Sequence, residues 1–344
     1  MASGGLAAVL ARAALPVLQR LPPEPAHELA LRALALTRTA WRKPAVSPRL
    51  AVHALGREFA HPVGLAAGFD KNGDYLDALG ALGFSHVEVG TVTPRPQSGN
   101  PKPRLFRVRE QRALINRMGF NNRGAEHVAG RLRASEYAGI RGVSIGKNAD
   151  TPLERAADDY LACLRTLYDV ADYFAINVSS PNTRGLRELQ AAAALASIVE
   201  PLREERRRLD AEHRRHVPLL VKISPDLEPD ELREMCAALK TLGLEGVIAT
   251  NTSTCLPGFE PRLAQAGGGG ISGAPLTTRA LEVLRVMRAA LGAEFPIISV
   301  GGIMSAADAQ VRIAAGANLL QLYTGFVYRG APLLGEILAA LENP

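Results

Sequence analysis

Short apolar runs alternate with longer helix-like segments along the chain from residue 60 onward. The runs are mostly apolar and nearly continuous, which is typical of strands buried on both faces. They lie at residues 63–68, 86–92, 143–148, 173–180, 219–224, 246–253, 296–302 and 319–325. Eight such strands separated by helices predict an α/β fold, a (β/α)8 TIM barrel over residues 51–344. An open, doubly wound sheet is the alternative, but it does not require eight comparable units.

Local signals between the strands mark where helices begin and end. Thr277 opens the segment TRALEVLRVMRAALG, and Ser305 precedes Asp308 by three residues, as an N-cap precedes its capping partner. Four glycines stand where helices should stop, at Gly83, Gly243, Gly292 and Gly316. Residues 93–142 are too many for one crossover, so we expect an excursion or lid over the barrel mouth there.

The first 50 residues differ from the rest in pattern and in charge. Two runs have helical period, with apolar positions at Leu6, Val9, Leu10, Ala13 and Val17 and then at Leu29, Ala33, Leu36, Ala40 and Trp41. Seven basic residues against two acidic ones give this segment +5 of the chain's net charge of +6. Arg12 and Pro16 interrupt the first run well short of the ~20 apolar residues of a membrane span. We expect a small N-terminal helical extension, either packed on the barrel or anchored in a membrane interface, and its acid-free start also resembles a transit peptide.

Composition excludes several classes of protein. With 47% hydrophobic and 22% charged residues, the 344-residue chain is typical of globular proteins. Cys163, Cys236 and Cys255 have no CxxC or Cys/His spacing, so we expect no metal site and no disulfide framework. Residues 203–215 hold six arginines against four acids, which is typical of a solvated helix face and not of a nucleic-acid site.

Polar side chains gather where the predicted strands end. The stretch YFAINVSSPNTRGL (173–186) passes from an apolar strand directly into Asn177, Ser179, Ser180 and Asn182. In a (β/α)8 barrel the carboxyl ends of the strands form the active site, so we expect these residues there. The other strand ends are also rich in Asn, Thr, Ser, Lys and Gly, and they are poor in His and in unpaired carboxylates. Metal-dependent hydrolysis and glycoside chemistry by a carboxylate pair are therefore disfavoured.

Glycine clusters and one lysine predict a phosphorylated cofactor with a planar ring. Small residues and backbone N–H groups stand where these barrels bind phosphate, in GGGGISG (267–273), VGGI (300–303) and YTGF (323–326). By strand alternation Lys222 points into the barrel, where its ammonium needs an anion. A flavin, whose N1/O2 edge becomes negative on reduction, would supply one. A structural pair with a carboxylate is the alternative, which we disfavour because no acid stands at the ends of the neighbouring strands.

Ten motifs in order along the chain carry a family resemblance. They are GLAAGFDKNG, GTVTPRPQSGNPKPRLFR, INRMGFNN, IGKN, NVSSPNTRGL, VKISPDL, ATNTS, GGGGISG, VGGI and LYTGF. In these the chain resembles the dihydroorotate dehydrogenase family, in its membrane-associated, quinone-reducing class 2. The resemblance covers almost the whole chain. It implies a barrel that holds FMN, oxidises (S)-dihydroorotate to orotate in de novo pyrimidine (UMP) biosynthesis and passes the electrons to ubiquinone or menaquinone.

The resemblance also implies a role for each matching residue. Ser180 would be the catalytic base. The substrate-binding residues would be Lys71, Asn116, Arg117, Met118, Gly119, Phe120, Asn177, Asn182, Asn251 and Thr252. The FMN contacts would be Ala67, Gly68, Thr91, Asn148, Asn177, Lys222, Thr250, Gly273, Gly302, Tyr323 and Thr324. Thr324 replaces the expected serine, and it keeps the hydroxyl and the backbone N–H.

The implied chemistry accounts for these residue types and for the class. Dihydroorotate must lose a proton from C5 and a hydride from C6, so the site needs a base on one face of the substrate and the flavin on the other. Pro181 keeps Ser180 out of helical geometry and stiffens its loop. Soluble members of the family carry a cysteine at the base position, whereas here it is Ser180 and the cysteines lie elsewhere. The quinone class is therefore indicated.

In that class the N-terminal extension has a function of its own. Residues 1–50 would dock on the membrane and admit quinone, which favours the membrane-anchor interpretation. We expect a monomeric peripheral membrane protein on the cytoplasmic face of a bacterial inner membrane, without nucleic-acid partners. A flavin-dependent RNA-modifying barrel and a non-catalytic FMN-binding barrel remain as alternatives. Lys71, Ser180 and the asparagines disfavour the second.

Overall fold

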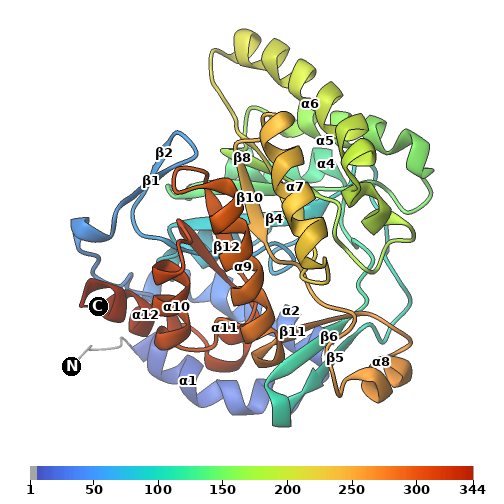
Figure 1. The fold of residues 1–344 in the computed structure, drawn as a ribbon. Helices are drawn as coiled ribbons and strands as arrows, with labels where there is room; N and C mark the ends of the chain where they lie inside the picture. The colour runs from blue at the N-terminus through green and yellow to red at the C-terminus, as the bar shows by residue number, and fades with distance from the viewer. Residues whose placement is uncertain (1–5, 344) are drawn as a thin grey trace.

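The computed structural model describes residues 6–343, and its centre is a closed barrel of eight parallel strands (Figure 1). The barrel strands are β3 (Val63–Leu65), β4 (His86–Val92), β7 (Ile140–Ile145), β8 (Tyr173–Asn177), β9 (Leu219–Ile223), β10 (Gly246–Ala249), β12 (Ile297–Val300) and β13 (Leu319–Leu322). The (β/α)8 prediction is confirmed. Several predicted runs, such as 246–253, are longer than the strand, and the extra residues form the mouth loops.

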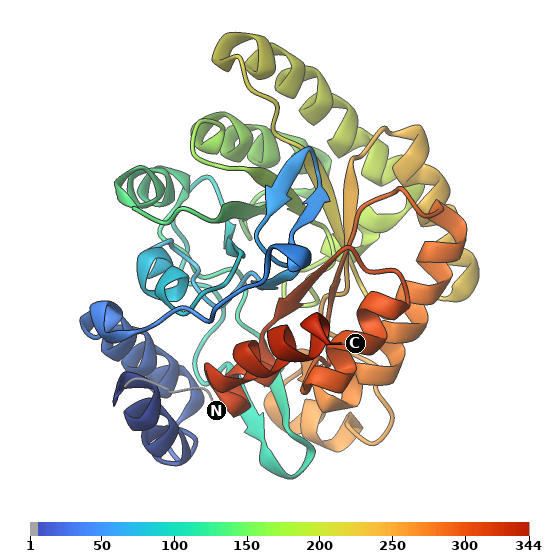
Figure 2. The same ribbon diagram turned by 90° about the vertical axis from the view of Figure 1, so that its left-hand side faces the viewer.

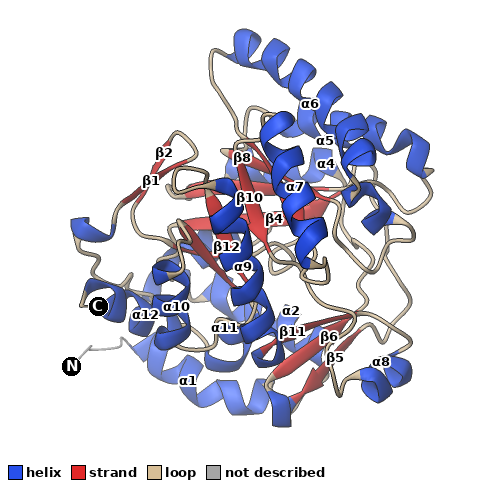
Figure 3. Ribbon diagram, viewed as in Figure 1, coloured by secondary structure: helices blue, strands red, loops and turns tan. Residues whose placement is uncertain are grey.

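Helices surround the barrel on its outside (Figure 3). They are α3 (Leu76–Ala81), α4 (Ala125–Ala134), α5 (Ala156–Leu167), α6 (Ala192–His213), α7 (Pro229–Thr241), α9 (Thr277–Leu291), α10 (Ala306–Ala314), α11 (Thr324–Arg329) and α12 (Pro332–Glu342). The short helix α8 (Glu260–Ala266) lies apart from them, against a second, smaller sheet. Ser305 Oγ accepts from the Asp308 backbone N–H at 3.2 Å, so the predicted N-cap of α10 is confirmed. The four predicted stop glycines all have positive φ, between 58° and 100°, which a Cβ would disfavour.

The strands separate two apolar layers. Side chains that point outward, such as Val221 and Ile223, pack between the barrel and its helices. Side chains that point inward, such as Leu220 and Ile248, fill the barrel interior. There they pack against a hairpin formed by β1 (Val52–Ala54) and β2 (Arg57–Phe59). Figure 2 shows this hairpin lying across one end of the barrel. Because that end is closed, the functional cavity lies at the other one.

The long excursion after β4 builds a second, smaller sheet beside the barrel mouth. Strands β5 (Leu105–Val108) and β6 (Ala113–Asn116) form an antiparallel hairpin, and β11 (Gly270–Gly273) pairs with β6. The segment GGGGISG therefore belongs partly to this sheet. The predicted excursion in 93–142 is confirmed, and it carries Asn116 to the mouth.

Two helices, α1 (Leu6–Leu18) and α2 (Pro23–Leu36), form the N-terminal extension and lie beside the C-terminal helices and the β5–β6 hairpin (Figure 2). Buried contacts hold the pair in place: Arg104 on the excursion binds Glu24 at 2.8 Å. Short 3-10 turns follow at Arg38–Ala40 and Pro48–Leu50. Within residues 6–343, no helix has the length and apolarity to cross a bilayer.

The outer side of this extension keeps several large apolar side chains exposed. Of the five such residues among the described side chains, four belong to it, namely Val17, Leu21, Leu29 and Leu36. Leu29 and Leu36 come from the predicted apolar stripe of α2, whereas Ala33 and Trp41 from the same stripe face a cavity. The side chains of Leu6, Val9 and Leu10 lie outside the described part of the chain.

Candidate active site

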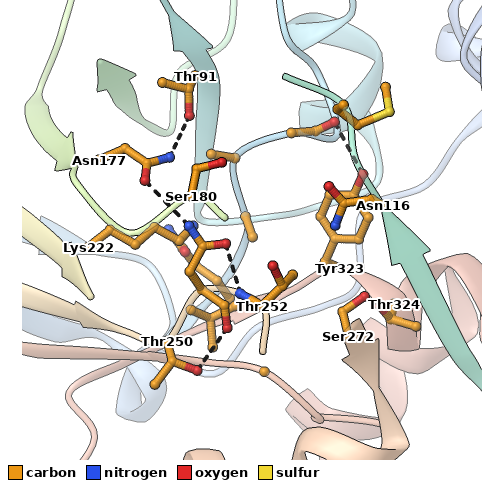
Figure 4. A pocket seen from close by; sticks show the side chains of 18 of the residues that line it. Thr91, Asn116, Asn177, Ser180, Lys222, Thr250, Thr252, Ser272, Tyr323 and Thr324 are labelled. Carbon is orange, nitrogen blue, oxygen red and sulfur yellow. Dashed lines mark hydrogen bonds between the residues drawn. The ribbon is translucent and has the colours of Figure 1, made fainter. Parts of the chain in front are cut away.

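A cavity opens at the carboxyl ends of the barrel strands, where the sequence places the site. It contains about 1030 Å³ of empty space, part of which is open to solvent. All the predicted site residues line it except Arg117 and Asn148. Strand ends, mouth loops and the small sheet all contribute, so the (β/α)8 fold brings together residues far apart in the sequence (Figure 4).

Neutral amides and hydroxyls form one wall of the cavity. The Asn177 side chain, at the end of β8, donates from Nδ2 to Thr91 Oγ1 at 2.8 Å and accepts at Oδ1 from Asn251 Nδ2 at 3.4 Å (Figure 4). Asn251 Nδ2 also donates to Ser179 Oγ at 3.0 Å. These side chains hold one another in fixed orientations, so their remaining donors and acceptors are preorganised for a polar ligand.

Ser180 lies on the loop after β8 and faces this wall. It is 5% exposed, and its Oγ accepts from the Asn182 backbone N–H at 3.3 Å. The Asn182 side chain donates to Asn116 Oδ1 at 3.0 Å, which ties this loop to β6. On the other side Arg187 donates to the carbonyl oxygens of Ser179 and Thr252, at 3.2 and 2.9 Å. The loop is therefore held on both sides, and Ser180 Oγ has a defined position in the cavity.

Lys71 reaches the cavity from the loop after β3. The Asp70 carboxylate accepts from the backbone N–H groups of Asn72, Asp74 and Tyr75, so it folds this loop into a tight turn. Burial lowers the pKa of Lys71 from its ordinary 10.5 to about 8. Lys71 therefore provides a cation that is easily neutralised in the physiological range.

Small residues and hydroxyls line the end of the cavity between β11, β12 and β13. Ser272 Oγ and Thr324 Oγ1 lie 2.8 Å apart, and Gly273, Gly301 and Gly302 stand beside them. A Cβ on Gly302, whose φ is 72°, would lie 2.4 Å from the Thr277 backbone. Close packing therefore requires glycine at this position, in addition to the predicted close approach of an anion.

Lys222 requires a correction. Its ammonium points into the barrel as predicted and lines the cavity, but its Nζ lies 3.5 Å from Glu88 Oε1. Glu88 is fully buried in the middle of β4. The carboxylate partner that we disfavoured is therefore present. It stands inside β4, which is separated from β9 by β7 and β8, and it reaches Lys222 through the barrel interior and not from the end of a neighbouring strand.

Arg117 and Asn148 also differ from their predicted places. The Arg117 guanidinium is exposed and donates to the Pro103 carbonyl at 3.1 Å, so it points away from the cavity. Asn148 is buried, but its Nδ2 bonds to Thr93, Arg95 and Gln97, at 3.1, 3.0 and 2.8 Å. Its side chain therefore ties mouth loops together and has no donor left for a ligand.

Several lining residues were not predicted from the sequence. They are Ala66, Gly90, Asn121, Ser272, Leu276, Val300, Gly301, Ile303, Gln321 and Gly325. Most neighbour a predicted residue in the sequence. Gln321 is different: it stands inside β13, and strand alternation was the signal that could have found it, since it points inward like Lys222.

A second, apolar cavity lies between the N-terminal helices and the barrel. It contains about 1380 Å³ of empty space, part of it open, and is lined by aliphatic and aromatic side chains from α1, α2 and α11. Its polar residues are Gln19, His27, Thr37 and Arg107. His27 Nε2 bonds to the Phe69 carbonyl at 2.8 Å, and burial, followed by the charge of Lys71, lowers its pKa to about 4. His27 is therefore neutral near pH 7.

Tyr323 lines both cavities. Its hydroxyl donates to the Gly68 carbonyl at 3.3 Å, and its ring meets Phe69 edge-on with centroids 5.7 Å apart. One aromatic side chain thus forms part of the wall between a polar cavity and an apolar one.

A closed (β/α)8 barrel with a polar, preorganised mouth at the carboxyl ends of its strands defines the protein as an enzyme of the barrel class. Comparison with known proteins gives the particular family. The family model described as dihydroorotate dehydrogenase matches residues 49–344. The chain therefore belongs to the dihydroorotate dehydrogenase family and is a flavin-dependent oxidoreductase.

Individual relatives agree with this assignment. The chain is 51% identical to a dihydroorotate dehydrogenase (quinone) of Alkalilimnicola ehrlichii, over 95% of this chain and 97% of that one. It is 50% identical to a protein of the same name from Nitrosospira multiformis, over 95% and 94%. A crystal structure of DHODH from Eimeria tenella in complex with ferulenol superposes with a TM-score of 0.88 at 36% identity, covering 96% of this chain and 94% of that one.

Proposed function

We propose that this protein oxidises (S)-dihydroorotate to orotate in de novo pyrimidine biosynthesis, with FMN as the hydride acceptor and a membrane quinone, ubiquinone or menaquinone, as the final electron acceptor. The observation that carries the proposal is the pair of cavities that share Tyr323. A polar chamber suits a charged pyrimidine, an apolar chamber suits a quinone, and a thin wall between them suits electron transfer.

The donor set of the polar cavity fits FMN. Glycine backbone and the hydroxyls of Ser272 and Thr324 lie together at one end, as a phosphate requires. Lys222 at the floor supplies a positive charge for an anionic ring edge, and Thr91, Thr250 and Gly68 offer further polar and backbone contacts. Bound there, FMN would accept the hydride from C6 of the substrate.

The residues on the opposite wall would bind and deprotonate the substrate. Asn116, Asn177, Asn182 and Asn251 offer amide donors and acceptors to the edges of the dihydropyrimidine ring. Lys71 supplies a cation for the carboxylate or for charge that develops during reaction. Ser180 Oγ would take the C5 proton, and the Asn182 N–H and the Arg187 contacts keep this oxygen in place.

The apolar cavity would admit the quinone. Its walls are aliphatic and aromatic, and Gln19 and Arg107 provide polar groups for a quinone carbonyl. Transfer of two electrons with two protons would return the reduced quinone to the membrane. Residues 1–50 would form the quinone-access segment and residues 51–344 the catalytic domain of a monomeric protein.

The extension would also hold the protein on the membrane, at the cytoplasmic face of a bacterial inner membrane. Val17, Leu21, Leu29 and Leu36 expose apolar surface, and the segment carries a net charge of +5, which favours anionic lipid. The alternative of a flavin-dependent RNA-modifying barrel is disfavoured, because the wall of the cavity is built from neutral amides and not from basic side chains that would bind RNA phosphates.

The test is the visible spectrum of the pure protein. We expect flavin bands that bleach anaerobically on addition of dihydroorotate and return on addition of quinone, and the released cofactor should be FMN. A colourless protein that fails to bind added FMN would refute the cofactor, and a yellow protein that dihydroorotate does not bleach would refute the substrate.

A further inference from the structure

The interior of the barrel beneath the polar cavity holds a buried polar cluster, formed by Glu88, Tyr173, Lys222 and Gln321. These residues come from four strands, β4, β8, β9 and β13, and all are at most 5% exposed. Tyr173 Oη and Gln321 Nε2 donate to Glu88 Oε2, at 3.0 and 2.8 Å, and Lys222 Nζ lies 3.5 Å from Oε1. Glu88 is therefore the acceptor at the centre of the cluster.

The contacts of Glu88 fit an ionised carboxylate. All three neighbours are donors, and burial together with Glu88 raises the pKa of Tyr173 well above its ordinary value, so its phenol keeps its proton. A buried carboxylate with three donors and an adjacent ammonium has the pairing that a charge inside a protein requires. Glu88 and Lys222 thus form a charge pair with the negative end in the barrel interior.

Only the positive end of this pair reaches the cavity. Lys222 and Gln321 line it, and Glu88 does not. Among the described residues, Glu88 is the one side chain that accepts a hydrogen bond from Lys222 Nζ. The distance between Nζ and Oε1, 3.5 Å, is long for a hydrogen bond. Since an ammonium has three donors, Lys222 keeps donors available toward a ligand above it.

We propose that Glu88 is a positioning residue that keeps Lys222 charged and aimed at the cavity, and that it thereby sets how strongly the protein prefers reduced over oxidised FMN. This rests on the proposed function. Without a counter-charge the buried ammonium of Lys222 would give up its proton more readily, because desolvation disfavours the charged form. The reduced flavin, which is the more negative form, would then lose more binding energy than the oxidised one.

The test compares Glu88→Gln with the parent protein. Dissociation constants of FMN from the flavin-free protein and the flavin reduction potential are measured between pH 6 and 9. We expect the variant to prefer reduced FMN at least as strongly as the parent at pH 6, because a negative charge near the flavin is removed. As pH rises this preference should fall below that of the parent, by about tenfold or more at pH 9, the effect of ~1.4 kcal/mol. Curves that stay parallel to the parent's across this range would overturn the proposal.

Two further variants separate a role through Lys222 from a general structural one. Tyr173→Phe removes one hydrogen bond to Glu88 and no charge, so we expect lower thermal stability without the new pH dependence. In a Lys222→Met background Glu88→Gln removes an unpaired buried carboxylate, so it should raise the flavin potential at pH 9, whereas with Lys222 present it should lower it. A change of the same sign in both backgrounds would show that Glu88 does not act through Lys222.

The parent protein serves as the separate control for the proposed function. If the parent does not bind FMN, the proposed function fails and the inference fails with it. If the parent binds FMN and Glu88→Gln matches it at every pH, the proposed function stands and only the role of Glu88 is refuted. If Glu88→Gln does not fold, Glu88→Asp takes its place, because the shorter side chain keeps the charge and withdraws it from Lys222. It should lose preference for reduced FMN as pH rises, in a weaker form, and a Glu88→Asp protein that matches the parent at every pH would refute the role of Glu88.

Discussion

Leu29 and Leu36 provide the sharpest test of membrane docking, since they are 51% and 86% exposed and neither lines a cavity. Transfer of a whole leucine side chain out of water is worth about 2 kcal/mol. In proportion to their exposure, the two residues together would contribute about 3 kcal/mol to insertion among acyl chains. We therefore expect the double variant Leu29→Ser/Leu36→Ser to bind vesicles about 100-fold more weakly.

The assay is co-sedimentation with vesicles that contain anionic lipid, at low and high salt, together with turnover on short-chain and long-chain quinones. Val311→Ser is the matched control, because Val311 is 44% exposed on α10, outside the extension. The double variant should keep its flavin reduction rate and its turnover with soluble quinone, and it should lose turnover with membrane quinone. Vesicle binding equal to that of the parent would refute the reasoning that these side chains enter the membrane.

Two predictions concern the polar cavity. Ser180→Ala should slow flavin reduction by dihydroorotate about 10²- to 10⁴-fold with FMN still bound, since a general base contributes that much, and near-parent rates in anaerobic stopped flow would overturn its role. Lys71 is positively charged below its pKa of about 8 and neutral above it, so the affinity for the orotate carboxylate should be full below pH 8 and fall by up to about tenfold per pH unit above it. Spectral titration of the flavin with orotate at each pH measures this affinity. The Lys71→Gln variant should bind orotate weakly, and its affinity should not change near pH 8. A change of affinity near pH 8 that persists in this variant would assign the titration to another group.

The fold was predictable because the barrel strands are mostly apolar and repeat eight times, with helix-like segments between them. The mouth was predictable for the same reason, since in this fold the strand ends must converge. The pairing of Lys222 was predicted wrongly. Alternation in HVEVGTV puts His86 and Glu88 on the inward face of β4, but the carboxylate was sought only at strand ends.

Side-chain direction in the loops could not be read from the sequence. Arg117 stands between Asn116 and Met118, which both line the cavity, and its own side chain turns outward to the Pro103 carbonyl. In α2 the periodicity predicted one apolar stripe, whereas two sides are apolar: Leu31 is buried toward the barrel and Leu36 is exposed. Helical period identifies an apolar residue, but only tertiary packing decides what covers it.

In the proposed function, the two chambers on either side of Tyr323 serve the two half-reactions. Ala30 on α2 lines the apolar cavity and not the polar one, so Ala30→Trp should fill the apolar chamber alone. The decisive measurement is rapid mixing of this variant and of the parent, first with dihydroorotate and then, once reduced, with quinone. We expect flavin reduction by dihydroorotate to be unchanged and reoxidation by quinone to be at least about tenfold slower. Equal reoxidation rates, or a matching loss in the reductive step, would contradict it.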